Sequence, residues 1–261
     1  MEKYICDNVF VPLRSAPRHK SEMLSQILFG EKFSVVDAIG SWIKIKAALD
    51  NETGWIDADH NYLTLDNDNE KGFVLNKPLV CFKKDKTPIT LEAGCEIYNP
   101  NFSNGTFRLA DNIFTVASEF NKDYVTINES ITETAVRFLN SPYMWGGRIP
   151  SGIDCSGFTQ LIFKIHGIAI TRNSRQQAKE GKPVDFINNA ESGDLVFFDD
   201  ELGNITHVGM ILSSGLVIHA SGRVRIDPID HQGIFKKEIN GYSHKLRTIR
   251  RILNCPVIIN K

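Results

Sequence analysis

The sequence predicts an α+β protein in which one or two small antiparallel β-barrels precede a C-terminal α+β domain. Three observations support this prediction. Residues 1–127 contain short, strand-like stretches separated by turn residues, with few helical periods. A helix-start signal follows at Ser130, and beyond it an amphipathic helix precedes several strand-like stretches. The composition, 42% hydrophobic and 23% charged over 261 residues, allows substantial cores in two or three domains.

The charge balance argues against several classes of partner. The 30 basic and 31 acidic residues give a formal net charge of −1, so we expect no bulk attraction to nucleic acid or to acidic membranes. The first residues lack the basic-then-apolar pattern of a secretory signal, and no apolar run is long enough to cross a bilayer. We therefore expect a cytoplasmic protein.

The five cysteines are scattered along the chain, at positions 6, 81, 95, 155 and 255. They show neither CxxC nor Cys/His ligand spacing, so we expect no disulfide framework and no zinc site or other metal. Four of them are interpreted as small, buried, inert thiols. Cys155 is the exception.

The first barrel is predicted over residues 1–66. Within residues 42–46 apolar and polar side chains alternate from Ile43 onward, and a polar turn leads to a second strand at Thr53. This pattern is typical of a small antiparallel barrel. Together with the preceding stretch 30–36, the segment 41–56 resembles the bacterial Src-homology-3-like barrels that accompany many wall hydrolases.

Two further domains are predicted after this barrel. The polar stretch 66–72 leads to short strands that include residues 74–75, 79–82 and 123–127, and we interpret 67–127 as a second, degenerate barrel. The third domain, 128–261, opens with a capping-box pattern at Ser130-Ile131-Thr132-Glu133, and the apolar positions 135, 138 and 139 continue a helical period.

Cys155 is predicted to lie in the first turn of an amphipathic helix that ends at Gly167. Phe158, Leu161, Ile162 and Ile165 give the helical spacing, and Asp154 is a good N-cap. Unpaired N–H groups and the helix dipole at such a position favour a thiolate. A buried, inert thiol is the alternative for a cysteine considered alone.

A base for this thiol is expected on a hairpin downstream. The strand-like runs 206–212 and 216–221 are joined by Ser213-Ser214-Gly215. A three-residue loop with a left-handed Gly215 pairs His219 with Gly209 and places both His207 and His219 on one face. A two-residue turn would place them on opposite faces. A cysteine at a helix start, a base and a group that orients the base together indicate thiol catalysis.

Five motifs in this order resemble the NlpC-type papain-like cell-wall peptidases, over about residues 130–252. They are Pro142-Tyr143-Met144-Trp145-Gly146-Gly147, Gly152-Ile153-Asp154-Cys155-Ser156-Gly157-Phe158, Gly193-Asp194-Leu195-Val196-Phe197-Phe198, His207-Val208-Gly209 and His219-Ala220-Ser221. The resemblance implies a papain-like C-terminal domain in which Cys155 is the nucleophile, His207 the base and His219 the residue that orients the base.

The resemblance also implies a substrate. Members of this family hydrolyse the bond between γ-D-glutamate and a diamino acid in peptidoglycan peptides. The chain is most similar to the branch with fused N-terminal barrels, which acts as a dipeptidyl-peptidase on small murein peptides, L-Ala-γ-D-Glu-diamino acid, with a free N-terminal L-alanine.

Two alternative functions remain open. The catalytic triad does not determine whether water, an amine or an alcohol resolves the thioester, so an amidase or acyltransferase on the same scaffold is the alternative enzyme. An inactive cell-wall-binding module is the alternative outside enzymes. No cofactor is expected for the peptidase or for either alternative.

The same resemblance implies a set of substrate contacts. Asp154, Glu22 and Tyr62 match the residues that hold the substrate ammonium, and Tyr143 matches a tyrosine that lines the site and helps to hold the oxyanion. Ser156 and Ser174 are further implied contacts. For most of these residues a structural reading exists as well. Asp154 and Ser174 can cap helices, Glu22 can be a solvated charge, Tyr62 a barrel-surface aromatic and Tyr143 a packing residue.

Overall fold

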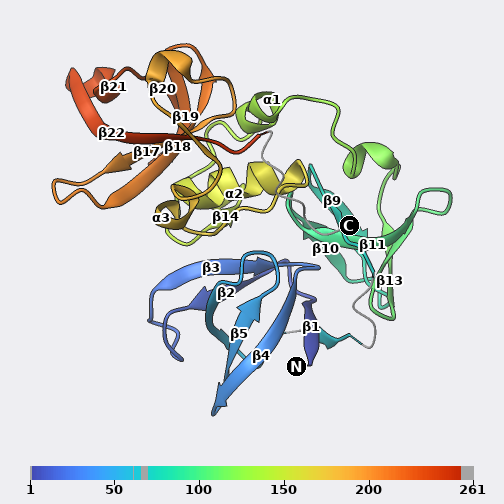
Figure 1. Cartoon of the computed structure of the whole chain (residues 1–261). Coiled ribbons are helices and arrows are strands. Elements are labelled where there is room, and N and C mark those ends of the chain that lie inside the picture. The colour runs from blue at the N-terminus through green and yellow to red at the C-terminus, as the bar shows by residue number, and fades with distance from the viewer. Residues whose placement is uncertain (1, 61, 66–69, 254–261) are drawn as a thin grey trace. The chain divides into compact units, whose positions relative to one another are not determined.

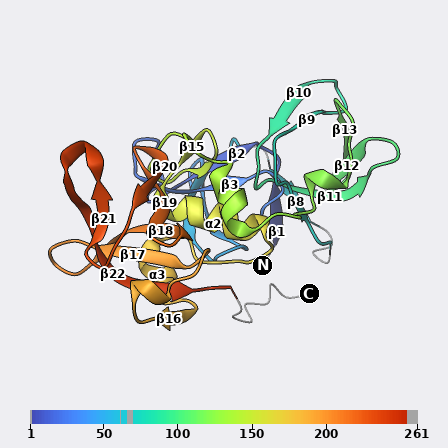
Figure 2. The same cartoon turned by 90° about the horizontal axis from the view of Figure 1, so that it is seen from above.

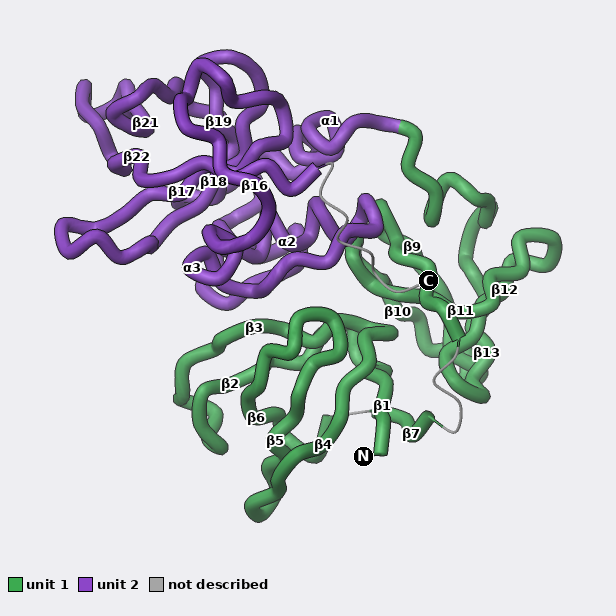
Figure 3. Tube along the Cα trace, viewed as in Figure 1, with its two compact units in different colours: residues 1–128 green, residues 129–261 purple. Residues whose placement is uncertain are grey.

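The computed structural model describes residues 2–60, 62–65 and 70–253. The chain divides into two compact units, Met1–Asn128 and Glu129–Lys261 (Figure 3). Both consist mostly of antiparallel sheets with few helices. The predicted α+β class is therefore confirmed.

Two sequence predictions fall outside the described residues. One is the expected boundary between residues 66 and 67, and the other is the inert, buried state of Cys255. The division into three domains stays a prediction. Among the helices of the described residues, none is long and apolar enough to cross a bilayer.

The N-terminal sheet has seven strands in the order β3-β2-β6-β5-β4-β1-β7. The strands are β1 (Lys3–Cys6), β2 (Phe10–Arg14), β3 (Met23–Leu28), β4 (Lys32–Ile39), β5 (Trp42–Ala47), β6 (Thr53–Asp57) and β7 (Tyr62–Thr64). Leu13, Phe33 and Ile45 are part of its core. The strand predicted at residues 42–46 is β5, whose antiparallel partners are β4 and β6.

A second sheet follows in the same unit, in the order β10-β9-β13-β12-β11-β8. Its strands are β8 (Phe73–Val74), β9 (Leu79–Phe82), β10 (Pro88–Leu91), β11 (Glu96–Asn101), β12 (Thr106–Leu109) and β13 (Asn112–Val116). Phe29, which follows β3, packs edge-on against Phe107 and Phe114, with ring centroids 6.3 and 5.4 Å away. The two sheets thus share aromatic packing, which explains why they form one compact unit.

The strand predicted at residues 123–127 is wrong. The segment instead contains a 3₁₀ helix, η1 (Lys122–Tyr124). The side chain of Asn121 accepts a hydrogen bond from the Asp123 N–H at 3.1 Å, which turns the chain at this point. Local capping therefore overrides the β-propensity of the tyrosine and valine.

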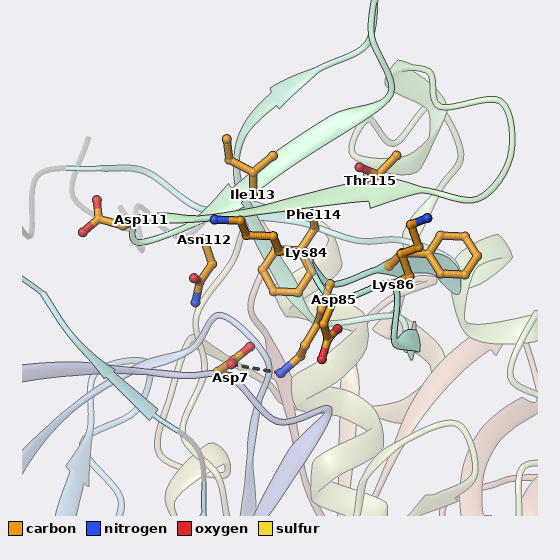
Figure 4. A pocket seen from close by; sticks show the side chains of 11 residues that line it. Asp7, Lys84, Asp85, Lys86, Asp111, Asn112, Ile113, Phe114 and Thr115 are labelled. Carbon is orange, nitrogen blue, oxygen red and sulfur yellow. Dashed lines mark hydrogen bonds and ion pairs between the residues drawn. The ribbon is translucent and has the colours of Figure 1, made fainter.

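A pocket of about 870 Å³ lies at the turns that follow β9 and precede β13 (Figure 4). Phe82, Ile113 and Phe114 supply its apolar lining, and charged side chains surround them. Lys83 Nζ lies 3.0 Å from Asp7 Oδ2, an ion pair that links this turn to the chain after β1. None of the predicted site residues lines this pocket.

The second unit has a sheet in the order β16-β22-β17-β18-β19-β20, with β21 paired to β22. Helix α2 packs against β18 and β19 (Figures 1 and 2). The elements are α1 (Ile131–Val136), β14 (Arg148–Ile149), β15 (Gly152–Ile153), α2 (Cys155–Ile165), α3 (Ser174–Gln177), β16 (Lys182–Val184), η2 (Ile187–Asn189), β17 (Leu195–Asp199), β18 (Ile205–Ser213), β19 (Leu216–Ser221), β20 (Arg223–Pro228), β21 (Gly233–Lys236), η3 (Lys237–Ile239) and β22 (Gly241–Arg251).

The first helix of this unit starts as predicted and ends earlier than predicted. The side chains of Ser130 and Glu133 form the reciprocal capping box. The helix ends at Val136, so Phe138 and Leu139 lie beyond it, although Phe138 is buried. Leu139 is exposed, so the apolar spacing predicted neither the end of the helix nor the burial of both positions.

Helix α2 is buried along its whole length, including its polar side chains. Thr159 Oγ1 donates to Gln177 Oε1 at 2.9 Å, and Gln160 Nε2 donates to the carbonyl of Ile170 at 3.0 Å. The polar face predicted from the amphipathic spacing therefore meets α3 and the segment before it. These hydrogen bonds offset the cost of burying polar groups and fix the helix that carries Cys155.

Candidate active site

Cys155 is the first residue of α2 and is 7% exposed. Asp154 precedes it as the N-cap, with extended backbone angles, and its Oδ1 accepts a hydrogen bond from the Gly157 N–H at 2.7 Å. The cap and the helix start match the sequence prediction. The thiol is thereby held at the end of the helix where backbone N–H groups are unpaired.

The resting thiol is not a thiolate, contrary to the prediction from the helix start. Burial raises the pKa of Cys155 to about 12, and the neighbouring Asp154 carboxylate adds to this effect. The backbone N–H groups of Val208 and Ser156 act in the opposite direction. Loss of solvent outweighs the helix start, because a thiolate depends strongly on solvation.

The two histidines lie on the hairpin formed by β18 and β19. Gly209 pairs with His219, as the sequence predicts. The turn contains only Ser214 and Gly215, and Gly215 has a φ of +75°. A bulge between Ile211 and Ser213 shifts the register by one residue. The prediction placed three residues in the loop, whereas the structure has two residues in the turn and one extra residue in the bulge. The pairing beyond the bulge is therefore the predicted one, and both histidines share one face.

Gly209 makes room for the pair. A Cβ atom at this position would lie 2.6 Å from Val217 Cγ2 and 3.1 Å from His219 Cβ. His207 Nε2 lies 2.8 Å from His219 Nδ1, and the two rings are nearly perpendicular, at 82°. The imidazoles therefore form a diagonal hydrogen-bonded pair across the strands.

Asp227 extends this pair and was missed in the sequence. Its Oδ2 lies 2.9 Å from His219 Nε2, and the carboxylate is 5% exposed. Strand β20 pairs with β19 so that Arg225 is opposite His219 and Asp227 is opposite Val217. Asp227 is thus a diagonal neighbour of His219. The tight turn at Gly222, followed by Arg225 and Asp227 in alternation, is a signal that could have revealed it.

His244 and Phe198 cover the ring of His207. His244 stacks on it with ring centroids 4.3 Å apart, and Phe198 lies 5.8 Å from it. Burial, with the charges of His219 and His244, holds the pKa of His207 well below its ordinary value of 6.5. His207 is therefore neutral in the resting site and can accept a proton.

Asp154 is also the centre of a buried polar cluster. Arg172 donates to both of its oxygens, through Nη1 at 3.0 Å and Nη2 at 2.6 Å. Arg172 Nη1 also donates to Ser156 Oγ at 2.9 Å, and the Gly146 N–H donates to Asp154 Oδ2 at 2.8 Å. The negative charge of Asp154 is thus compensated within the protein.

Two family models match the chain. The model of the NlpC/P60 family matches residues 140–243, and the model of the bacterial dipeptidyl-peptidase Sh3 domain matches residues 13–60. The second unit carries an NlpC/P60 domain. That domain is a cysteine peptidase domain, the first unit carries an Sh3 domain of the bacterial dipeptidyl-peptidase type, and the predicted papain-like fold is confirmed.

Several known proteins are similar to most of the chain. The chain is 29% identical over 246 residues to a γ-D-glutamyl-L-lysine dipeptidyl-peptidase of Bacillus cereus, with 83% of this chain and 74% of the relative covered. It is 29% identical over 213 residues to the enzyme of that name in Bacillus subtilis, with 75% and 71% covered. The crystal structure of an NlpC/P60 family protein from Bacillus cereus has a TM-score of 0.79 at 21% identity and covers 96% of this chain and 99% of its own. This last likeness supports the fold.

Tyr143 lies close to Cys155 in the second unit. It forms a β-bridge with Ile153, and its N–H donates to the carbonyl of Gly222 at 3.0 Å. Burial raises the pKa of Tyr143 to about 12, and Cys155 and Asp154 add to the effect. The structure therefore brings together Tyr143, Asp154, Cys155 and Ser156.

The remaining predicted contacts are placed as follows. Ser174 is the first residue of α3 and Asn173 is its N-cap, so the reading of Ser174 as a cap is wrong. Glu22 is exposed just before β3 in the first unit. Tyr62, on β7, packs against Tyr4 and Phe33 with ring centroids 5.4 and 5.8 Å away. Tyr62 is thus a half-buried barrel residue. The roles of these residues in binding substrate stay predictions.

No arrangement in the described part of the chain groups three or more His, Cys, Asp or Glu side chains for metal binding. The chemistry that the site can carry out with its own groups is nucleophilic attack by Cys155 with a histidine as base.

Proposed function

We propose that this chain hydrolyses the γ-D-glutamyl–diamino acid bond of small murein peptides that carry a free N-terminal L-alanine. The observation that carries the proposal is the similarity, over 83% of the chain, to an enzyme named γ-D-glutamyl-L-lysine dipeptidyl-peptidase. The dipeptidyl-peptidase Sh3 domain at residues 13–60 supports it. A cytoplasmic location, where such small peptides would be degraded, belongs to the same proposal.

The first half of the reaction forms an acyl-enzyme. Cys155 begins as a neutral thiol, beside the backbone N–H of Val208, the residue that follows His207. As the sulfur attacks the γ-glutamyl carbonyl carbon, His207 takes the thiol proton. The Cys155 N–H and the Tyr143 hydroxyl stabilise the oxyanion. The C–N bond then breaks, and His207 returns the proton to the amine of the departing diamino acid.

The second half releases the dipeptide. Water attacks the thioester while His207 removes one of its protons, and the C–S bond breaks with proton return to the sulfur. The products are L-Ala-D-Glu with a free γ-carboxylate, the diamino acid and unchanged enzyme. His219 holds the ring of His207 through the 2.8 Å contact during both halves.

End selectivity is the finer part of the proposal. Asp154, Glu22 and Tyr62 are proposed to hold the ammonium of the substrate, with Tyr143, Ser156 and Ser174 contacting the rest of the peptide. A site built for an ammonium disfavours an acylated amine, because acylation removes the charge and leaves polar groups unpaired. Intact, acylated peptidoglycan is then a poor substrate.

The decisive experiment compares free and N-acetylated L-Ala-γ-D-Glu-diaminopimelate, and the matching L-lysine peptides, with product identification by mass. We expect L-Ala-D-Glu and the free diamino acid from the free peptides, and at least about tenfold less product from the acetylated ones. Cys155→Ala should abolish turnover while the protein stays folded, and Cys81→Ala is the matched buried control.

Other outcomes would identify other activities. Equal cleavage of free and acetylated peptides would make the enzyme an endopeptidase. Transfer of the dipeptide to an added amine or alcohol would make it an acyltransferase. Hydrolysis by Cys155→Ala would contradict the mechanism, and binding without turnover would indicate a wall-binding module.

A further inference from the structure

The hydrogen-bonded line His207, His219, Asp227 continues beyond the two histidines to a carboxylate for which neither the sequence nor the family match provides a role. The two contacts, 2.8 Å from His207 Nε2 to His219 Nδ1 and 2.9 Å from His219 Nε2 to Asp227 Oδ2, use three of the four ring nitrogens. His207 Nδ1 alone remains outside the line. The protonation of these nitrogens decides whether His207 can act as a base.

The carboxylate fixes where the protons are. An ionised carboxylate can only accept hydrogen bonds, so the neutral ring of His219 must carry its proton on Nε2. His219 Nδ1 is then an acceptor, and it can be satisfied only if His207 carries its proton on Nε2. His207 Nδ1 consequently has a free lone pair. The position of the lone pair on the base is set by a residue two hydrogen bonds away.

We propose that Asp227 is a positioning residue that sets the tautomers of both histidines and thereby makes His207 Nδ1 the base for Cys155. The proposal deepens, and rests on, the proposed thiol chemistry of this site. The side-chain contacts of Asp227 are with His219 and Arg225. It acts through His219.

The surroundings keep Asp227 ionised and in place. Arg225 Nη2 donates to Asp227 Oδ1 at 2.7 Å, and Arg225 Nε lies 2.7 Å from Oδ2. Burial alone would raise the pKa of Asp227, but the hydrogen bonds from His219 and Arg225 lower it to about 2. Arg225 is held in turn by Glu238, at 2.7 Å. The carboxylate therefore stays an acceptor near neutral pH and above.

The remaining charged neighbours act on the histidines. His244 stacks on His207, and Lys236 acts on His244. Neither His244 nor Lys236 is part of the hydrogen-bonded line, so the direction of its hydrogen bonds is set from the Asp227 end.

Asp227→Asn is the informative substitution, because it keeps the shape and changes one acceptor into a donor. Arg225 Nη2 donates a hydrogen bond to Oδ1, whereas Arg225 Nε lies 2.7 Å from Oδ2 without hydrogen-bond geometry, so the amide oxygen stays at the position of Oδ1 and the NH₂ faces His219 Nε2. His219 must then carry its proton on Nδ1, and His207 must carry its own on Nδ1 as well. Both tautomers reverse while the fold is kept.

The test reads the tautomers directly by ¹⁵N NMR of histidine-labelled protein, with His207→Gln and His219→Gln variants for assignment. In the wild type we expect Nε2–H on both rings at neutral pH, and in Asp227→Asn we expect Nδ1–H on both. Alkylation of Cys155 by iodoacetamide, followed against pH, should slow by about 100-fold in Asp227→Asn. Asp227→Glu keeps an acceptor and should restore most of the rate and the shape of the pH profile.

Asp194→Asn is the matched control. Asp194 is a buried aspartate that pairs with an arginine, Arg251, with Nε–Oδ1 and Nη2–Oδ2 distances of 2.9 and 2.8 Å, and it takes no part in the histidine line. Its substitution should lower stability without changing the tautomers or the alkylation profile. Nδ1–H on His219 in the wild type, or unchanged tautomers in a folded Asp227→Asn, would overturn the proposal. Because no peptide is used, these results are independent of the substrate proposed above.

Discussion

The carboxylate of Asp154 and the guanidinium of Arg172 form a buried bidentate pair at the start of α2, with oxygen–nitrogen distances of 3.0 and 2.6 Å, and Asp154 directly precedes Cys155. The two side chains are 9% and 3% exposed. Asp154 also caps α2. One carboxylate therefore holds the helix start, the arginine and the backbone that leads to Cys155.

The first prediction concerns the cost of breaking this pair. Arg172→Met leaves the Asp154 charge buried without its cation, and we expect a loss of about 3–5 kcal/mol in the free energy of unfolding. Urea unfolding measures it. Arg251→Met is the matched control, because Arg251 pairs with another buried aspartate, Asp194, but is itself 25% exposed. The control should lose less, since solvent screens its pair. Equal losses would contradict this account.

The second prediction separates the two proposed duties of Asp154. Asp154→Asn retains a capping oxygen but loses the ion pair with Arg172, so activity should fall on both free and acetylated peptides. The proposed ammonium contact adds a further loss, of roughly tenfold, on the free peptide alone. Steady-state kcat/KM on the two peptides gives the ratio. An unchanged ratio would assign Asp154 to the helix start and to Arg172 only.

The third prediction is that His207 and His219 act as one unit. In the proposed mechanism His219 only orients the ring of His207. Once His207 is removed, the loss of His219 should therefore cost no further activity. We expect His207→Ala to lose nearly all activity, His219→Ala to lose much of it, and the double variant to be no worse than His207→Ala alone. If the double variant loses the product of the two single effects, the histidines act independently.

Much of this site could be predicted from local sequence, and the reason is visible in particular residues. The cap at Asp154 and the pairing of Gly209 with His219 follow from short-range rules of helix starts and hairpins. The bulge between Ile211 and Ser213 could not be predicted from these rules, although it produces the predicted pairing of Gly209 with His219. The predicted register came from a three-residue loop, and the observed two-residue turn keeps that register only because the bulge adds one residue.

The missed residues depend on longer-range contacts. Arg172 reaches Asp154 from a segment 18 positions away, and Asp227 reaches His219 only because β20 pairs with β19. The ionisation of Cys155 was also misjudged, since the helix start is visible in sequence while the burial that raises the pKa of its thiol is not. Sequence spacing identified Cys155 and the two histidines as candidates, whereas burial in the folded protein determines the ionisation of the Cys155 thiol.

The last prediction is a loss of stability in mild acid that originates at the histidine stack. Burial, followed by the charges of His219 and Lys236, lowers the pKa of His244 from 6.5 to about 4, and burial lowers the pKa of His207 as well. Below pH 6.5 the unfolded chain binds protons that the folded protein does not, so the free energy of unfolding must fall as the pH falls.

The affected window runs from about pH 6.5 down to 4 for His244, and each proton of difference gives a slope of about 1.4 kcal/mol per pH unit. Urea unfolding at several pH values measures this slope. His244→Gln removes one such group without removing any member of the line from His207 to Asp227, so its slope should be less steep than that of the wild type. Identical slopes would show that His244 takes up its proton equally in the folded and unfolded states, and the loss in acid would then have to originate at His207.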